Sequence, residues 1–499
     1  MENSLTRRSL LTGAGASALL LGETEVLVAA PPRKLPRARP EAEGMNPAGI
    51  LAFVEAVEAK KLGLHSLMLL RHGKVLAEGW WSPYAPQHPH MLYSLSKSFT
   101  STAVGLVVSE GKLALGDKVL SFFPDERPKN PDANLAVMEV RHLLMMGTGH
   151  DKDTTGAALS QPDGDWARGF LSLPVEHAPG SKFVYNTAAT YMLSAIVQKV
   201  TGKTVLEYLR PRLFEPLGIA NPTWETCPKG RSTGGFGLAI TTEDIAKFGQ
   251  LYLQKGQWEG RQLIAERWIT EATSPQIVNG DPAAPSDWTQ GYGYQFWRCR
   301  HGVYRGDGAF GQFCIVLPQY DAVVALTSGS NDLQGIVNAV WEHLLPAYQS
   351  SKVAPSPALA SRLKALALPV PEGQTGSLVA KQVRGKTYKF TPNPQKIESV
   401  RLTDSQVILR MDQKEIRLSY QSAGWVRGEA ALGSYPSTRV TTRGVWTSPD
   451  TLVVTSCAYE TPYLHTLTCQ FTGNTVSLTL KINVTFSPIA SPTLTGTTG

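Results

Sequence analysis

The sequence predicts an α/β domain followed by an all-β domain, and three observations carry this prediction. The chain has 499 residues, more than one hydrophobic core usually organises, so at least two domains are expected. Up to residue 349, apolar runs of helical length occur together with short strand-like runs. From residue 377 onward, short segments rich in β-branched residues follow one another between turns. We therefore expect an α/β domain at residues 31–349 and an antiparallel β domain at residues 377–486.

Apolar runs predict the main elements of the first domain. Residues 94–110 and 188–200 each form a run of helical length, and each is closed by a glycine that can end a helix. Residues 313–318 and 322–326 are short, apolar and rich in β-branched residues, which is typical of buried strands. The first domain is therefore expected to combine buried helices with a sheet.

The first of these helices begins with a serine and a lysine three residues apart, Ser94 and Lys97. Positions i and i+3 share one face of a helix, so the lysine amine can reach the serine hydroxyl. A serine hydroxyl is a weak nucleophile unless a neighbouring base takes its proton. Burial and the positive end of the helix dipole both favour the neutral lysine, which is the form that acts as a base.

Two further segments stand out by their position beside regular structure. Tyr185 follows the loop at residues 179–184 and precedes the second helix, so it is expected at a loop-to-helix junction. Farther along, the glycine-rich residues 306–311 open the strand predicted at residues 313–318.

The order and spacing of these three segments resemble the serine β-lactamase and penicillin-recognising superfamily, and specifically its class C branch. That branch also holds D-alanyl-D-alanine peptidases and carboxylesterases. The resemblance covers roughly residues 40–347 and includes the supporting stretches at residues 140–149 and 235–238. It implies an antiparallel sheet flanked by helices, together with a helical subdomain.

The resemblance also implies roles for individual residues. Ser94 would be the acylated nucleophile, Lys97 would assist its deprotonation, and Tyr185 would relay protons to the leaving group. The oxyanion hole would consist of the backbone NH groups of Ser94 and Ala309.

The chain departs from the family pattern at its expected substrate-binding residues. The class C branch usually has Tyr-x-Asn in the second segment, whereas this chain has Thr187 at the third position. In the third segment, Gly306, Asp307 and Gly308 stand where relatives carry Lys or His, then Thr or Ser, then Gly. The missing cation is the group that holds a substrate carboxylate, and Asp307 would repel such a carboxylate. Arg305 is the candidate substitute for the cation.

Ser232 lies in Gly-x-Ser-x-Gly, the pattern of the nucleophile elbow of α/β-hydrolases. That elbow requires an apolar strand before the serine and a helix directly after it. Here a polar segment precedes Ser232 and a glycine-rich loop follows, so we interpret it as a loop residue.

Composition and isolated motifs exclude several other functions. The formal net charge of +7 is modest for this length, and lysines and arginines are scattered, so no nucleic-acid partner is predicted. His88, His90, His150 and His177 form no recognisable ligand array. We therefore predict neither a metal nor a cofactor.

The N-terminal residues 1–30 resemble a twin-arginine export signal, with Arg7 and Arg8 followed by an apolar run at residues 12–21. A cut after Ala30 fits the small residues there. The alternative is a basic tail beside a short apolar segment. The apolar run is too short for an ordinary membrane span, and no other candidate span occurs.

The remaining segments are a linker and a tail. Residues 350–376 are rich in proline and predict a linker around one short helix at residues 358–368. Residues 487–499 are expected to be a disordered tail. Cys457 and Cys469 lie on two predicted strands, where they either form a disulfide or remain as buried thiols.

Together these features predict an exported, periplasmic or secreted serine hydrolase that cleaves a small ester, amide or peptide-like substrate through an acyl-enzyme on Ser94. One alternative is a β-lactamase or a D-alanyl-D-alanine carboxypeptidase. A second is a sensor that uses the pocket for recognition with little turnover. The oligomeric state is not predicted.

Overall fold

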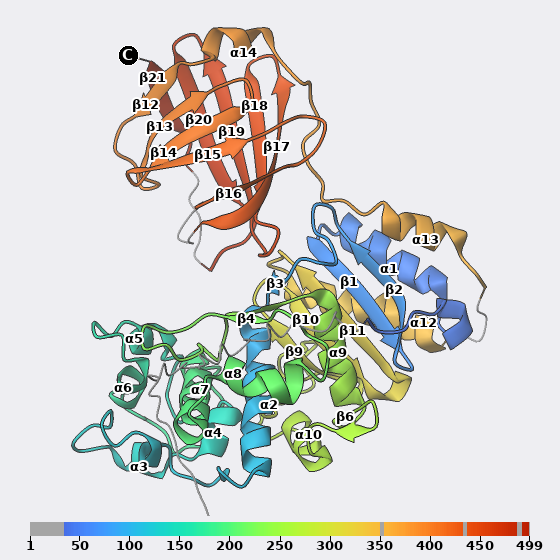
Figure 1. Ribbon diagram of the computed structural model, residues 1–499, viewed down its shortest axis with the longest axis vertical. Coiled ribbons are helices and arrows are strands. Elements are labelled where there is room, and N and C mark those ends of the chain that lie inside the picture. The colour runs from blue at the N-terminus through green and yellow to red at the C-terminus, as the bar shows by residue number, and fades with distance from the viewer. Residues whose placement is uncertain (1–33, 350–353, 433–436, 487–491, 499) are drawn as a thin grey trace, which may run out of the picture.

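The computed structural model describes residues 34–349, 354–432, 437–486 and 492–498. They form an N-terminal domain, residues 34–349, and a C-terminal domain, residues 377–498, joined by a short linker (Figure 1). The expected export signal lies outside the described residues. Within the described part of the chain, no helix is long and apolar enough to cross a membrane.

An antiparallel sheet of six strands, in the order β2-β1-β11-β10-β9-β8, forms the centre of the N-terminal domain. The strands are β1 (Leu64–Arg71), β2 (Lys74–Trp80), β8 (Trp297–Arg298), β9 (Tyr304–Gly308), β10 (Gln312–Leu317) and β11 (Ala322–Ser328). The two strands predicted after residue 312 are confirmed as β10 and β11. Because β9 lies beside β10, the glycine-rich third segment becomes part of the sheet.

Helices cover both faces of this sheet. Successive side chains along a strand point to opposite faces, so the residues of β1 contribute to two different cores. On one face, Leu67 and Leu69 of β1 join a buried core with α1 (Pro47–Ala59), α11 (Leu333–Ala339) and α12 (Leu345–Gln349). On the other face, Met68 and Leu70 join a core with α2 (Ser96–Ser109) and α9 (Thr242–Leu253). The predicted helix at residues 94–110 is confirmed as α2, preceded by one 3₁₀ turn, η2 (Tyr93–Leu95).

A helical subdomain lies beside α2 (Figure 1). Its helices are α3 (Ala133–Val137), α4 (Val140–Leu144), α5 (Thr155–Leu159), α6 (Trp166–Leu171), α7 (Thr187–Thr201) and α8 (Val205–Leu209). The second predicted helix is confirmed as α7, which Gly202 ends in a left-handed conformation. The smaller elements of the domain are β3 (His90–Met91), β4 (Thr223–Trp224), β5 (Leu238–Ile240), β6 (Gln257–Trp258), β7 (Arg261–Gln262) and α10 (Glu266–Thr273).

The C-terminal domain is one antiparallel sheet of ten strands, in the order β15-β14-β13-β12-β21-β20-β19-β18-β17-β16, curled into a near-barrel (Figure 1). The strands are β12 (Thr387–Phe390), β13 (Ile397–Leu402), β14 (Gln406–Met411), β15 (Lys414–Ser419), β16 (Val426–Ala430), β17 (Thr438–Ser448), β18 (Thr451–Cys457), β19 (Leu464–Thr472), β20 (Thr475–Ile482) and β21 (Leu494–Thr498). The domain also contains α14 (Leu378–Val383), and the linker contains α13 (Pro357–Lys364). The antiparallel β fold expected from residue 377 onward is confirmed.

The expectation of a disordered tail at residues 487–499 is wrong for the part that the structure describes. Residues 494–498 form β21, which pairs with both β12 and β20. The composition of this segment is polar, but its threonines are β-branched and its backbone hydrogen-bonds to two neighbouring strands. The domain therefore extends beyond residue 486, the boundary expected from the sequence.

Cys457 and Cys469 do not form a disulfide, and both are described as buried free thiols. In the β18–β19 register Cys457 lies opposite Leu464, whereas Cys469 lies opposite Leu452. The two cysteines thus occupy opposite ends of the paired strands, well beyond the ~7 Å Cα separation that a disulfide tolerates. Of the two alternatives, buried thiols are correct.

Candidate active site

Ser94 lies in η2, one turn before α2, and its side chain is partly exposed. The residue before it, Tyr93, has a φ of 49°, in the left-handed region that bulky side chains rarely adopt. This turn presents a serine hydroxyl at the N-terminal end of a buried helix.

Lys97 is buried in the first turn of α2, with 1% of its surface exposed. Its Nζ donates hydrogen bonds to Ser94 Oγ at 3.1 Å, to Thr187 Oγ1 at 3.1 Å and to the Gly235 carbonyl at 2.8 Å. The predicted i, i+3 contact between Ser94 and Lys97 is therefore present. The three acceptors fix the direction of the amine.

Burial lowers the pKa of Lys97 to about 7, and the carboxylates of Asp153 and Asp307 oppose this by favouring the charged amine. An ordinary lysine titrates near ~10.4. Close to neutral pH a substantial share of Lys97 is therefore unprotonated, which is the form that can accept a proton.

Tyr185 lies just before Asn186, the N-cap of α7, at the expected loop-to-helix junction. Its ring stacks on Trp297, with 5.4 Å between centroids, and Lys97 Nζ lies 5.0 Å from the centre of the Tyr185 ring. Burial raises the pKa of Tyr185 far above its ordinary value; Asp307 adds to this, and a hydrogen bond with Ser94 opposes it. The structure thus brings Ser94, Lys97 and a neutral tyrosine together.

Thr187 belongs to the hydrogen-bond shell of Lys97, through the contact already described. The neighbouring Asn186 is buried, and its side-chain amide bonds to Thr154 instead of the site. Gly235 lies close to Thr187 and Lys97 because it has no side chain. A Cβ on Gly235 would lie 2.6 Å from Thr187 Cγ2. Thr187 and Gly235 together hold the lysine amine.

The third segment has no room for an anchoring side chain at either glycine. A Cβ on Gly306 would lie 2.5 Å from Leu95 Cδ1 and 2.6 Å from Ser98 Oγ, and one on Gly308 would lie 2.0 Å from the Leu92 carbonyl oxygen. Both glycines therefore face the turn that carries Ser94. Their lack of a side chain lets the backbone of β9 approach this turn closely.

Asp307 and Arg305 form a buried ion pair, which corrects two expectations. Arg305 Nη2 lies 2.9 Å from Asp307 Oδ2, and the two residues are 0% and 7% exposed. Burial raises the pKa of Asp307 and the guanidinium opposes this, so the carboxylate remains half of an ion pair. Asp307 is thus neutralised and is not a bare repulsive charge. Arg305 stacks over Trp288 at 4.2 Å and is not available to replace the missing substrate-binding cation.

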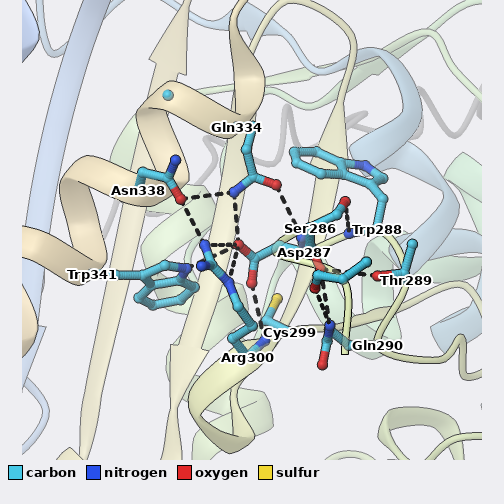
Figure 2. Close-up of polar contacts among 12 residues, drawn as sticks. Ser286, Asp287, Trp288, Thr289, Gln290, Cys299, Arg300, Gln334, Asn338 and Trp341 are labelled. Carbon is cyan, nitrogen blue, oxygen red and sulfur yellow. Dashed lines mark hydrogen bonds and ion pairs between the residues drawn. The ribbon is translucent and has the colours of Figure 1, made fainter. Parts of the chain in front are cut away.

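The ion pair is held in place by a polar network around Asp287 (Figure 2). Asp287 is fully buried, and its Oδ2 accepts hydrogen bonds from Arg300 at 2.7 Å, Gln334 at 2.8 Å and Trp341 at 3.0 Å. Burial alone would raise the pKa of Asp287, but these hydrogen bonds lower it. The Asp287 carbonyl accepts from Arg305 Nη1 at 2.8 Å, so the network fixes the guanidinium that pairs with Asp307.

We predict that Asp307→Asn lowers the free energy of unfolding of the N-terminal domain by about 3–5 kcal/mol, because it leaves the Arg305 guanidinium buried without its counter-charge. Urea unfolding at pH 7 would measure the loss. Asp412→Asn, which removes one partner of an exposed ion pair with Lys396, is the control and should change stability by less than about 0.5 kcal/mol. Equal midpoints for the two variants would contradict this account of the pair.

The profile of the Beta-lactamase family matches residues 53–345, more than half of the chain. The chain belongs to the Beta-lactamase family. Ser94, Lys97, Tyr185 and the third segment all lie inside the matched region.

Named relatives of this Beta-lactamase family chain are hydrolases of several kinds. It is 25% identical over 287 residues to 6-aminohexanoate-dimer hydrolase from Paenarthrobacter ureafaciens, covering 54% of this chain and 73% of the relative. It is 27% identical over 190 residues to esterase EstB from Burkholderia gladioli, covering 34% and 48%. It is 27% identical over 140 residues to a putative D-alanyl-D-alanine carboxypeptidase from Escherichia coli K12, covering 26% and 32%. The chain thus spans less than half the length of the last two relatives.

Solved structures share the fold of this Beta-lactamase family chain. A putative 6-aminohexanoate-dimer hydrolase from Bacillus anthracis superposes with a TM-score of 0.53 at 19% identity, covering 66% of this chain and 91% of that one. An octameric penicillin-binding protein homologue from Pyrococcus abyssi superposes with a TM-score of 0.50 at 19% identity, covering 86% and 97%. The second match is longer than the N-terminal domain and linker together, so it reaches into the C-terminal sheet.

Sequence reasoning missed the residues that support the motifs. Asp287 binds partners that are 13, 47 and 54 residues away, and no local pattern marks such a network. Trp297, which stacks on Tyr185, lies in an aromatic-rich stretch just before the third segment, and that density was the available signal.

Ser232 lies in the loop between β4 and β5, as expected, where its backbone forms an isolated bridge with Thr226. It is 1% exposed, and its hydroxyl finds no hydrogen-bond partner among the residues that the structure describes. In the same described part of the chain, no three His, Cys, Asp or Glu side chains gather as a metal site requires.

Proposed function

We propose that this protein is an exported serine hydrolase that cleaves an ester or amide bond through an acyl-enzyme on Ser94. One observation carries the proposal: the amine of a buried lysine, with a pKa lowered to about 7, lies 3.1 Å from a partly exposed serine hydroxyl. A nucleophile within hydrogen-bond reach of a base with a suitable pKa is the arrangement that acyl transfer requires.

In the first half-reaction, Ser94 Oγ bonds to the substrate carbonyl carbon while neutral Lys97 takes the hydroxyl proton. The carbonyl electron pair moves onto oxygen, and the NH groups of Ser94 and Ala309 are the proposed donors to this oxyanion. The ester or amide bond then breaks, and the leaving alcohol or amine receives a proton through Tyr185. The Tyr185 side chain is hydrogen-bonded to Ser94. The product of this step is the acyl-enzyme.

In the second half-reaction, water attacks the acyl carbon and gives a proton to the Lys97 and Tyr185 pair. The bond to Ser94 breaks, Oγ recovers its proton, and the free acid leaves. Because Thr187 and Gly235 both accept from Lys97, the amine keeps its direction toward Ser94 through both steps.

The arrangement of the third segment favours substrates that carry no carboxylate for the protein to bind. Gly306 and Gly308 leave no room for a cationic side chain, and Arg305 is engaged by Asp307. Relatives named as an esterase and as a 6-aminohexanoate-dimer hydrolase support ester and amide substrates. A β-lactamase or carboxypeptidase activity, and a sensor with little turnover, are the alternatives that an assay must separate.

We predict that the purified protein hydrolyses uncharged short-chain p-nitrophenyl esters at least about tenfold faster, in kcat/KM, than a chromogenic cephalosporin. The reason is the lost contact with the cephalosporin carboxylate, because one charge-assisted hydrogen bond contributes about 1.5–3 kcal/mol. A panel that also includes small p-nitroanilide amides would measure the preference. Faster cephalosporin turnover would replace the esterase proposal with β-lactamase activity, and labelling of Ser94 without turnover of any substrate would favour a sensor.

The proposed location and subfamily rest on the sequence. Arg7, Arg8 and the apolar run after them support twin-arginine export to the periplasm or the medium. Within the Beta-lactamase family, Ser94 with Lys97 and the tyrosine at position 185 support assignment to the class C branch. Cleavage after Ala30 in secreted material, read by N-terminal sequencing, is the direct test of export.

A further inference from the structure

The C-terminal domain contacts the N-terminal domain beside Ser94. The loop at residues 458–463, which joins β18 to β19, receives hydrogen bonds across the interface: Met91 NH donates to the Glu460 carbonyl at 2.8 Å, and Tyr84 OH donates to the Thr461 carbonyl at 2.9 Å. At the end of this loop, the hydroxyl groups of Tyr463 and Tyr93 are hydrogen-bonded to each other. Figure 1 shows the C-terminal domain above β3, the strand that precedes Tyr93.

Two aromatic residues in strained backbone conformations flank the proposed oxyanion hole. Tyr93, with a φ of 49°, immediately precedes Ser94, and Phe310, with a φ of 66°, immediately follows Ala309. A bulky side chain in the left-handed region is strained and persists only where the surroundings hold it. The two backbone NH groups proposed as donors therefore each adjoin a residue that must be held in place.

The residues that hold both conformations belong largely to the C-terminal domain. The rings of Tyr93 and Phe310 meet edge to face, 5.4 Å apart, and both join the buried core of the C-terminal domain. Phe310 lies 6.1 Å from the Tyr463 ring, and Phe486 lies 5.6 Å from Tyr93 and 4.7 Å from Phe310. Tyr463 is 4% exposed and contacts both strained residues, one through its hydroxyl and one through its ring.

We propose that Tyr463 of the C-terminal domain is a positioning residue for catalysis, which holds the backbone of Tyr93 and Phe310 so that the NH groups of Ser94 and Ala309 converge on one oxygen. This inference rests on the proposed function. It assigns the C-terminal domain a part in transition-state stabilisation, although that domain supplies none of the proposed reacting groups.

Tyr463→Phe tests the proposal, because it removes the hydroxyl bonded to Tyr93 and keeps the ring against Phe310. The matched control is Tyr84→Phe, which removes another tyrosine hydroxyl bonded to the same loop, at the Thr461 carbonyl and not at Tyr93. We expect Tyr463→Phe to lower kcat about tenfold with KM within about twofold of the parent. That loss is smaller than the 10²–10³ that removal of a whole oxyanion donor costs. Tyr84→Phe should leave kcat within about twofold.

A second readout does not depend on turnover. The phosphoryl oxygen of a fluorophosphonate occupies the oxyanion hole, so its rate of reaction with Ser94, followed by intact mass, should also fall about tenfold in Tyr463→Phe. Tyr93→Phe removes the other half of the hydroxyl pair and should give the same loss, and the double variant should be no slower than either single variant.

The outcomes separate this inference from the proposed function. If the parent hydrolyses esters and reacts at Ser94 but Tyr463→Phe matches it in both rates, the inference is overturned and the proposed function stands. If Tyr84→Phe and Tyr463→Phe lose equal activity, Tyr463 serves only to attach the domains and the inference is again overturned. A parent that neither hydrolyses any substrate nor reacts at Ser94 overturns both.

Discussion

Ser94→Ala should abolish hydrolysis, with a fall in kcat of about 10⁶, the loss that follows removal of the nucleophile in a serine hydrolase that forms an acyl-enzyme. The Ser94 hydroxyl is the proposed nucleophile, because Lys97 Nζ lies 3.1 Å from its Oγ. Steady-state kinetics on the preferred ester would measure the loss, and intact mass should show no fluorophosphonate adduct on the variant.

Ser232→Ala is the control for this substitution. Ser232 is the serine of the Gly-x-Ser-x-Gly pattern; it is buried, and its hydroxyl has no hydrogen-bond partner within the described ranges of the chain. Removal of an unsatisfied buried hydroxyl is close to neutral for stability, so the variant should fold and keep the parent kcat. Loss of activity in a folded Ser232→Ala variant, with activity retained in Ser94→Ala, would reverse the assignment of the nucleophile.

Lys97→Met should lower kcat by about 10²–10⁴, the usual contribution of a general base. Methionine fills a similar volume but cannot accept the Ser94 proton. In the parent, kcat/KM should rise with pH through a group that titrates near 7, because burial lowers the pKa of Lys97 to about 7 and only the neutral amine accepts a proton. Lys97→Met should lack this rising limb. A pH–rate profile from pH 5 to 9 would measure both effects.

Lys247→Met is the control for Lys97→Met, because Lys247 is also a buried lysine but has no proposed role in catalysis. Lys247 is 2% exposed and pairs with Asp244 in α9, so its removal should lower stability. The rising limb near pH 7 should nevertheless remain. A profile for Lys97→Met that keeps the same limb as the parent would show that another group titrates there, and the role proposed for Lys97 would be wrong.

The sequence was sufficient to predict the parts of the site that lie close together along the chain. The Ser94–Lys97 contact follows from helix geometry, and the junction at Tyr185 follows from the apolar run after it. The apolar runs also predicted helices α2 and α7 and strands β10 and β11, and the family resemblance implied their arrangement. These features depend on spacing of a few residues, which the sequence displays directly.

The parts that the sequence did not predict depend on distant pairings. Arg305 appeared to be a spare cation because its partner network, built around Asp287, comes from residues up to 54 positions away from Asp287. The contact of Tyr93 with Tyr463 spans 370 residues. Strand β21 was expected to be disordered because its local composition is polar, whereas its order comes from hydrogen bonds to β12 and β20 on either side.

The position of β21 within the sheet determines when the C-terminal domain can complete its fold. Although it is the last strand to be synthesised among those described, β21 lies in the interior of the sheet, so without it β12–β15 and β16–β20 would each expose a bare edge. Bare edges pair with other chains. The sheet that carries Tyr463 can therefore be completed only after β21 has been synthesised. Loss of β21 would therefore disturb the domain that contacts Tyr93, the residue before the proposed nucleophile Ser94.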